Sequence, residues 1–143
     1  GDCLNYGCVP SKAMIAAGRK GSVINIGSGA SRKMRLTAAP YCISKTALDR
    51  LTKAMGQELA QFGIRVNALA PGPIATDALR ARLATRHQEG GPSPDQVLQD
   101  MAADTALGRM ATVEDVANAA HFLASDASTG MTGLVLPVEA GLG

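Results

Sequence analysis

The fold is decided by two short apolar segments, Gly21-Ser22-Val23-Ile24-Asn25-Ile26 and Ile64-Arg65-Val66-Asn67-Ala68-Leu69. Both are rich in β-branched residues, which is typical of buried strands. A long helical pattern from Tyr41 to about Phe62 separates them, and Gly63 is suited to end that helix in a left-handed conformation. A strand–helix–strand unit of this kind predicts parallel pairing through a right-handed crossover. The helix face that we expect to be buried carries Leu48, Leu51, Met55 and Leu59.

Further elements follow towards the C-terminus. Pro71-Gly72-Pro73 predicts a turn, since proline and glycine favour turn conformations. Pro137 then places the last predicted strand at a sheet edge, or marks the end of that strand. The elements expected after the turn are a helix capped by Thr76 or Asp77 and running to about Arg86, a helix from Ser93-Pro94 to about Ala103, a helix from the capping box Thr112–Asp115 through Leu123, and a strand from Gly133 to Val138.

Composition limits the classes of protein that fit. At 143 residues the chain is one domain at most, and with 46% hydrophobic residues it can form a core. A net charge of +2 and only 3% aromatic residues argue against a nucleic-acid partner. No apolar run is long enough to span a membrane, and three cysteines are too few for a secreted disulfide framework. We therefore expect a soluble, cytoplasmic α/β domain with no membrane partner.

Three polar residues form a candidate catalytic group. Ser28 follows the first predicted strand, Tyr41 begins the long helix, and Lys45 follows Tyr41 by one helical turn. Residues at i and i+4 share a helix face, so the Lys45 ammonium can lie beside the Tyr41 phenol. A nearby cation favours the phenolate and lowers the pKa of a tyrosine from about 10 towards neutral pH. Ser28 would hydrogen-bond the oxygen that gains or loses the proton, at the carboxyl end of the sheet where ligands bind.

Residues 21–143 resemble the C-terminal half of a short-chain dehydrogenase/reductase. The resemblance rests on five motifs in the order of that family: GSVINIGS, YCISK (Tyr-x-x-x-Lys), RVNALAPGPIATD, LGRMATVEDVA and GLVLPVEAG. It implies reversible hydride transfer between NAD or NADP and a ketone or secondary alcohol. One mild departure is Glu139-Ala140-Gly141, where the family often has Asp-Gly-Gly.

The resemblance also implies roles for individual residues. Tyr41 would be the general acid/base and would also contact the cofactor, Lys45 would hold the nicotinamide ribose, and Ser28 would orient the substrate carbonyl. The nicotinamide site would be lined by Pro71, Gly72, Ile74 and Thr76, with the Ile74 backbone and the Thr76 side chain on the carboxamide. Residues 78–105 correspond to the variable substrate lid.

One part of a dinucleotide site is absent from these 143 residues. The family's Thr-Gly-x-x-x-Gly-x-Gly turn, which binds the pyrophosphate at a helix N-terminus, does not occur, and Asn5 does not match the family's relay asparagine. The expected fold is therefore α/β and Rossmann-like, a partial doubly wound parallel sheet of about three strands and four to five helices. Its first strand would be an exposed edge, so we expect a homo-oligomer, with the helix from Tyr41 at the interface.

The first 13 residues resemble a different family. Cys3 and Cys8, followed by Val9-Pro10-Ser11-Lys12, match the redox-disulfide segment of pyridine nucleotide–disulfide oxidoreductases. We therefore divide the chain into a segment 1–13, which is not a domain, and a half domain 14–143, with a suspected junction near residues 13–19. A working disulfide would need a flavin or an exchange partner.

The remaining candidates are less specific. Arg32, Lys33 and Arg35 could bind an anionic substrate, although a solvated loop is favoured. His87 and His121 have no partners at metal-ligand spacing, so no metal site is predicted. Cys42 is expected to be a packing residue.

Three hypotheses of function follow. The first is a short-chain dehydrogenase/reductase domain acting on a small carbonyl or alcohol substrate, impaired by the missing cofactor-binding half. The second is a thiol–disulfide redox segment on an inert scaffold. The third is a non-catalytic chimeric remnant.

Overall fold

The computed structural model describes residues 13–33 and 38–142 and contains a three-stranded parallel sheet with the order β1-β2-β3. Short 3-10 helices occupy Gly29–Ser31, Ala60–Phe62 and Asp126–Ser128. The strands and α-helices, in chain order, are β1 (Gly21–Ile26), α2 (Ala39–Glu58), β2 (Ile64–Pro71), α3 (Asp77–Gln88), α4 (Pro94–Ala103), α5 (Val113–Ala124) and β3 (Val135–Val138).

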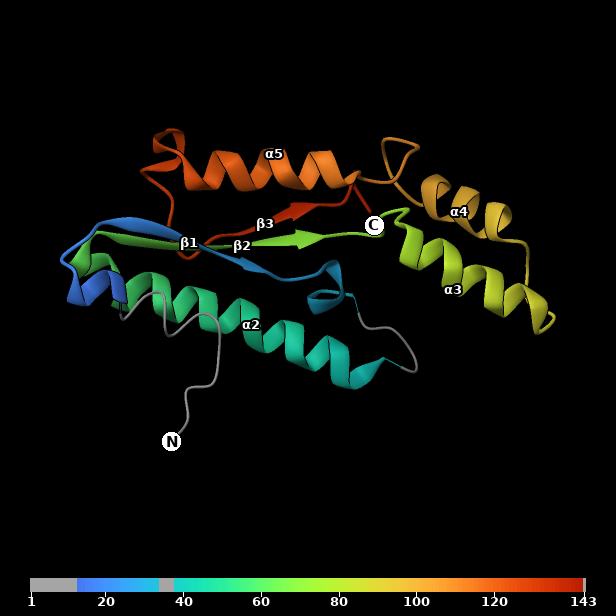
Figure 1. The fold of residues 1–143 in the computed structure, drawn as a ribbon, viewed down its shortest axis with the longest axis horizontal. Coiled ribbons are helices and arrows are strands. Elements are labelled where there is room, and N and C mark those ends of the chain that lie inside the picture. The colour runs from blue at the N-terminus through green and yellow to red at the C-terminus, as the bar shows by residue number, and fades with distance from the viewer. Residues whose placement is uncertain (1–12, 34–37, 143) are drawn as a thin grey trace.

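The sheet lies between two helical layers. Figure 1 shows α2 on one face of the sheet and α5 on the other, with α3 and α4 beyond the carboxyl ends of the strands. The central strand β2 is buried along most of its length, since five of its apolar residues are almost inaccessible to solvent. Continuous burial is expected of a parallel strand that is covered on both faces. The expectation of a Rossmann-like, partial parallel sheet is therefore confirmed.

The local end signals also agree with the structure. Thr76, Ser93 and Thr112 are the N-caps of α3, α4 and α5, and Gly63 has a φ of +69° after the helical segment. Thr112 and Asp115 form a complete capping box. Pro137 lies in β3, which pairs only with β2 among the described strands.

The predicted helix face and helix end were partly wrong. The α-helix ends at Glu58, and Ala60–Phe62 forms a tighter 3-10 turn before Gly63. Leu51 is 50% exposed, whereas Cys42, Thr52 and Gly56 are buried. Gly56 lets α2 pack closely against the segment that leads into β3, and Thr52 accepts a hydrogen bond from Asn25 of β1.

The buried side chain of Asn67 and the hydroxyl of Thr132 fix β3 beside β2. The buried Asn67 side chain donates from Nδ2 to the Met131 carbonyl (3.0 Å) and accepts at Oδ1 from the Leu134 backbone N–H (3.0 Å). Thr132 Oγ1 accepts from the Val66 N–H at 3.1 Å and donates to the Gly56 carbonyl at 3.3 Å. Buried polar groups must find such partners, so these bonds select one placement of the segment before β3.

The Gly56 contact gives a test of this packing. A Cβ at Gly56 would lie 2.6 Å from the Gly133 nitrogen and 2.8 Å from its Cα. Alanine is the better helix former by about 1 kcal/mol, yet overpacking against backbone costs about 1–3 kcal/mol. We predict that Gly56→Ala lowers the free energy of unfolding in urea. Gly130→Ala, with no atom within 4 Å of the new Cβ, should leave it nearly unchanged. A more stable Gly56→Ala variant would contradict the close approach.

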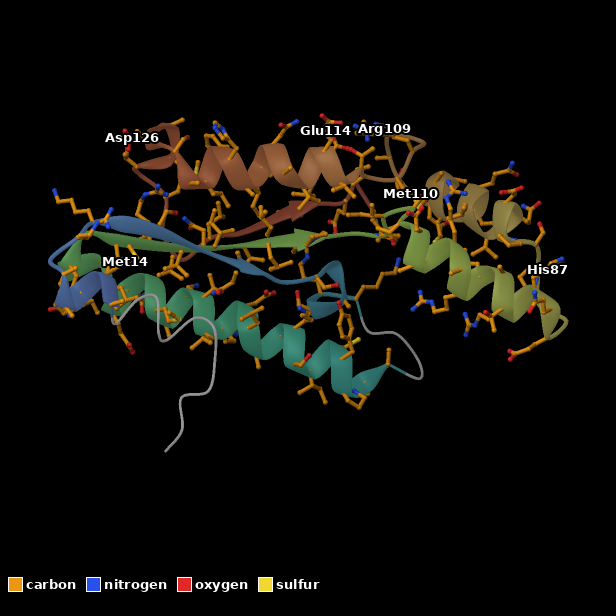
Figure 2. The ribbon with its side chains drawn as sticks, in the orientation of Figure 1. Met14, His87, Arg109, Met110, Glu114 and Asp126 are labelled. Carbon is orange, nitrogen blue, oxygen red and sulfur yellow. The ribbon has the colours of Figure 1, made fainter. Side chains whose placement is uncertain are left out.

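The start of α5 gives a pH-dependent prediction. Hydrogen bonds from Arg109 (2.8 Å) and then from the Thr112 backbone (2.9 Å) lower the pKa of Asp115 from 3.8 to about 2. Figure 2 shows Arg109 beside this end of α5, with Glu114 nearby. Because the folded pKa lies below the ordinary value, the stabilisation is complete above about pH 4 and is lost as the pH falls towards 2.

We therefore expect Asp115→Asn to lower the melting temperature at pH 6, and this difference from the native chain should shrink steadily between pH 4 and 2. Glu114→Gln, which alters a neighbouring carboxylate in the same turn, is the control and should show a smaller effect. A difference that stays constant down to pH 2 would refute the assigned role of the Asp115 carboxylate.

Candidate active site

The first wall of the site forms where β1 ends. The Gly27 N–H donates to the Leu69 carbonyl at 2.7 Å, and a Cβ at Gly27 would lie 3.0 Å from that oxygen. The glycine therefore lets the chain leave the sheet close to β2. Ser28 follows directly as the N-cap of the 3-10 helix, where its Oγ accepts from the Ala30 N–H at 3.2 Å. Its hydroxyl hydrogen remains able to donate to another acceptor.

The second wall is the first turn of α2. Tyr41 lies there with half of its surface exposed. Lys45, one turn later, donates from Nζ to the Ile26 carbonyl at 2.9 Å, and the same atom is 5.7 Å from the centre of the Tyr41 ring. Lys45 thus connects α2 to the end of β1 and holds a positive charge within cation–π range of the ring.

The third wall is the loop that follows β2. The Gly72 N–H donates to the Val138 carbonyl at 3.0 Å, and a Cβ at Gly72 would lie 2.7 Å from the Glu139 Cβ. Glycine is therefore needed for this loop to pack on the segment after β3. Thr76 ends the loop as the N-cap of α3, and its Oγ1 accepts from the Leu79 N–H at 3.2 Å.

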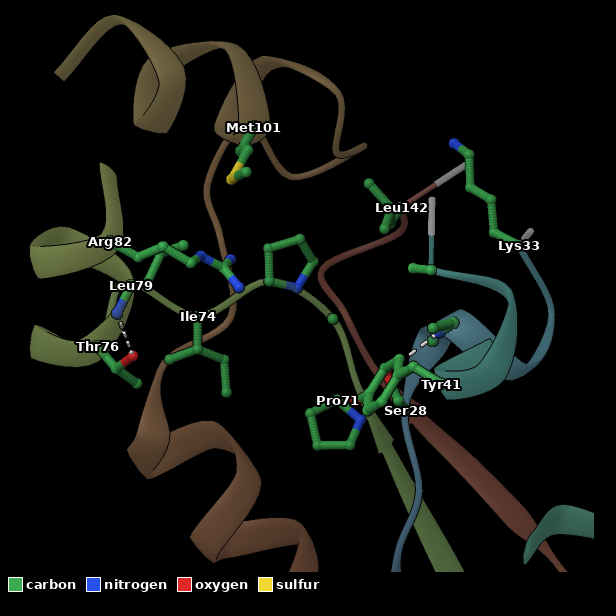
Figure 3. Close-up of a pocket in the computed structure, with 15 residues that line it drawn as sticks. Ser28, Lys33, Tyr41, Pro71, Ile74, Thr76, Leu79, Arg82, Met101 and Leu142 are labelled. Atoms are coloured by element: carbon green, nitrogen blue, oxygen red, sulfur yellow. Dashed lines mark hydrogen bonds between the residues drawn. The ribbon is translucent and has the colours of Figure 1, made fainter. Parts of the chain in front are cut away.

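These three walls enclose a cavity of about 630 Å³ (Figure 3). Of the residues assigned a site role from the sequence, the cavity is lined by Ser28, Tyr41, Pro71, Gly72, Ile74 and Thr76. Lys45 does not line it, because its ammonium lies against the Ile26 carbonyl. Figure 3 shows Tyr41 and Ser28 on one side of the cavity, opposite Ile74 and Thr76.

Sequence reasoning did not single out several other lining residues. Three of them lie on α3 and α4: Leu79, Arg82 and Met101. All three belong to the segment 78–105 expected to form the substrate lid, and this was the one sequence signal that they could line the site. The lining residues without any individual assignment are Gly29, Ala30, Ala38, Pro73, Leu79, Arg82, Met101 and Leu142.

The basic loop after Ser28 is not simply solvated. The Arg32 guanidinium forms an ion pair with Glu139 at 2.8 Å, and the Glu139 side chain is only 15% exposed. Lys33 lines the cavity, and Arg35 lies outside the described residues. The ion pair was missed because its partners are 107 positions apart in the sequence.

The remaining sequence candidates lie elsewhere. His87 is at the far end of α3 (Figure 2), where the Gly91 carbonyl accepts from its Nδ1 at 3.0 Å. Across residues 13–33 and 38–142, no three His, Cys, Asp or Glu side chains converge on a possible metal site. In the same part of the chain, no helix has the length and apolar character needed to cross a membrane. Cys42 is buried and unpaired, as a packing residue would be. Cys3 and Cys8 lie outside the described residues.

A parallel sheet covered by helices on both faces, with a cavity at the carboxyl ends of its strands, defines a Rossmann-like α/β fragment. The family model described as "Enoyl-(Acyl carrier protein) reductase" matches residues 6–143. This match covers most of the chain, which therefore belongs to the short-chain dehydrogenase/reductase family.

Individual relatives agree with this assignment. Dehydrogenase/reductase SDR family member 6 of Xenopus laevis is 40% identical over 118 residues, which are 82% of this chain and 46% of the relative. The crystal structure of a gluconate 5-dehydrogenase from Burkholderia cenocepacia J2315, in complex with NADP and tartrate, superposes with a TM-score of 0.82 at 38% identity and covers 97% of this chain and 51% of that one.

NAD⁺-bound xylitol dehydrogenase is a further structural match, with a TM-score of 0.80, 29% identity and coverage of 92% of this chain and 52% of that chain. The chain thus spans about half the length of the relatives it matches.

Proposed function

We propose that this chain carries the catalytic half of an NAD(P)-dependent oxidoreductase that interconverts a ketone and a secondary alcohol. The observation that supports this most is that Ser28 and Tyr41 line one cavity together with the loop from Pro71 to Thr76. The hydroxyl groups of Ser28 and Tyr41 could both hydrogen-bond one substrate oxygen. The loop across the cavity has donors suited to a carboxamide. Relatives named for xylitol and gluconate oxidation add support for a polyhydroxylated substrate.

The donor groups of the loop fit a nicotinamide. Within residues 13–33 and 38–142, the Ile74 N–H has no acceptor, while its carbonyl accepts from the Thr76 N–H at 2.8 Å. The Thr76 hydroxyl accepts from Leu79 and so keeps its own hydrogen for a ligand. A free N–H beside a free O–H donor suits the oxygen of a carboxamide, and Ile74 and Pro71 add apolar surface for its ring.

Each catalytic side chain has a separate task in the proposed reaction. NAD(P)H, when bound, supplies the hydride for the carbonyl carbon. Tyr41 donates its hydroxyl proton to the carbonyl oxygen, so that the ketone becomes a secondary alcohol, and in the oxidative direction it takes that proton back. Ser28 donates a hydrogen bond to the same oxygen and orients the carbonyl. Lys45 contributes its positive charge beside the Tyr41 ring, and in this proposal it also holds the nicotinamide ribose.

We propose that cofactor affinity is low in these 143 residues by themselves. They contain no Thr-Gly-x-x-x-Gly-x-Gly turn, and that turn supplies the backbone N–H groups that bind a pyrophosphate. The nicotinamide end of the cofactor would then provide most of the binding contacts. Catalysis would be impaired as a result, because less of the protein would hold bound cofactor.

Two further features of the chain stay predictions. Self-association through α2 is supported by its exposed apolar side chains, Ile43 and Leu51. A Cys3–Cys8 disulfide rests on the sequence resemblance alone.

A fluorescence titration of NADH and NADPH tests the cofactor site. We expect saturable binding by the native chain and about 3- to 10-fold weaker binding by Thr76→Ala, because a hydrogen bond to the ligand is lost. Thr76→Ala also removes a helix cap. Ser93→Ala is therefore the matched control, since it removes the cap of α4 without touching the cavity. Equal weakening in both variants, or no binding at millimolar cofactor, would reject the proposed site.

The acid–base role of Tyr41 needs an activity readout. With diacetyl and NADPH as probes, Tyr41→Phe should lower the reductase rate by about 10²- to 10⁴-fold while cofactor affinity falls by no more than about 10-fold. Gln57→Ala, at an exposed polar position of α2 outside the cavity, serves as the control and should keep the native rate. Native activity in Tyr41→Phe would refute the assignment.

A further inference from the structure

The charge of the candidate site is concentrated in a side chain that the proposed reaction does not use. Arg82, on α3, lines the cavity, and Figure 3 shows its side chain extending from the helix towards the loop that follows β2. Lys33 is the other charged lining residue, and it is also cationic. None of the described lining residues is acidic. Both side chains are exposed at the cavity wall, and a wall with this charge favours an anion over a neutral molecule.

Arg82 lacks the partners that usually neutralise an exposed helical arginine. Its neighbours one turn away are Ala78, Leu79, Thr85 and Arg86, so no carboxylate shares its helix face. Across the described part of the chain, its guanidinium forms neither an ion pair nor a hydrogen bond. Five N–H donors are thus available at the wall of the cavity.

Two other arginines, Arg65 and Arg32, have partners elsewhere in the fold. Arg65 donates to the carbonyls of Leu123 (3.0 Å) and Ser125 (3.1 Å) and to Ser128 Oγ (2.9 Å). Arg32 is paired with Glu139 at 2.8 Å. This comparison separates Arg82 from the arginines that hold the fold together. Arg82 instead lines the cavity, and its N–H donors have no partner in the described part of the chain.

We propose that Arg82 binds a carboxylate or phosphate group of the substrate, so that the preferred substrate is an anionic ketone or the corresponding hydroxy acid. This inference rests on the proposed function and adds the substrate class to it. The planar guanidinium can bind such a group through two parallel hydrogen bonds. Leu79 and Met101 supply apolar contacts for the carbon chain between the anionic group and the carbonyl near Ser28 and Tyr41.

A matched pair of ligands tests the inference without requiring turnover. Levulinate is a small keto acid, and its methyl ester presents the same ketone without the charge. We expect calorimetric titration to show that the native chain binds levulinate about 5- to 10-fold more tightly than the ester, a preference that salt weakens. Arg82→Gln should remove the preference by weakening levulinate alone. Arg80→Gln, the same change on the same helix outside the cavity, should keep it.

Several results would overturn the inference. Equal levulinate binding by Arg82→Gln and the native chain would show that the arginine makes no contact with the acid. An equal loss in Arg80→Gln would indicate a general effect of net charge. Weaker NADPH binding in Arg82→Gln with unchanged levulinate binding would assign Arg82 to the phosphates of the cofactor. If the native chain binds NADPH but shows no preference for levulinate, the inference fails while the proposed function stands.

Discussion

The rest of the structure depends on two hydrogen bonds made by the side chain of Asn67 in the central strand β2. This side chain is fully buried and satisfied by two backbone groups of the segment before β3. An amide left unpaired at this depth would cost about 1–3 kcal/mol, so the segment must run where Asn67 meets it. The parallel register of β3 on β2 follows from that placement, and so does the position of the chain after β3. Glu139 then packs against Gly72, which lines the cavity.

The same region also positions the helix that carries Tyr41. Thr132 bonds both the β2 backbone and the Gly56 carbonyl of α2, and the absent side chain of Gly56 lets the helix approach Gly133. At the other end of α2, Lys45 holds the helix to the last carbonyl of β1. These contacts at both ends of α2 set how the helix, and with it the Tyr41 backbone, lies relative to the loop after β2. A rigid scaffold of this kind is what a proton-transfer site requires.

Much of this architecture could be predicted from local sequence signals. The strands around Val23 and Val66 have clear β-branched patterns, and the caps at Thr76, Ser93 and Thr112 depend only on nearby residues. The exposure of Leu51, in contrast, depends on which helix face α2 turns to a segment about 80 residues away. The Arg32–Glu139 ion pair likewise joins residues that are far apart in the sequence, so local signals do not predict it. For the site, the spacing of Ser28 and Tyr41 and the family resemblance together pointed to six residues that line the cavity. The orientation of Arg82 depends on how α3 packs in three dimensions, which no motif encodes.

The central claim is that this chain retains a nicotinamide site at the carboxyl ends of β1 and β2. Saturation-transfer NMR of NADPH with the native chain tests it most directly, because it reports which protons of the cofactor contact the protein. The account predicts strong saturation of the nicotinamide protons and weak saturation of the adenine protons, since the cavity has donors for the carboxamide and the chain has no Gly-rich turn. Saturation concentrated on the adenine, or none on either ring, would contradict it.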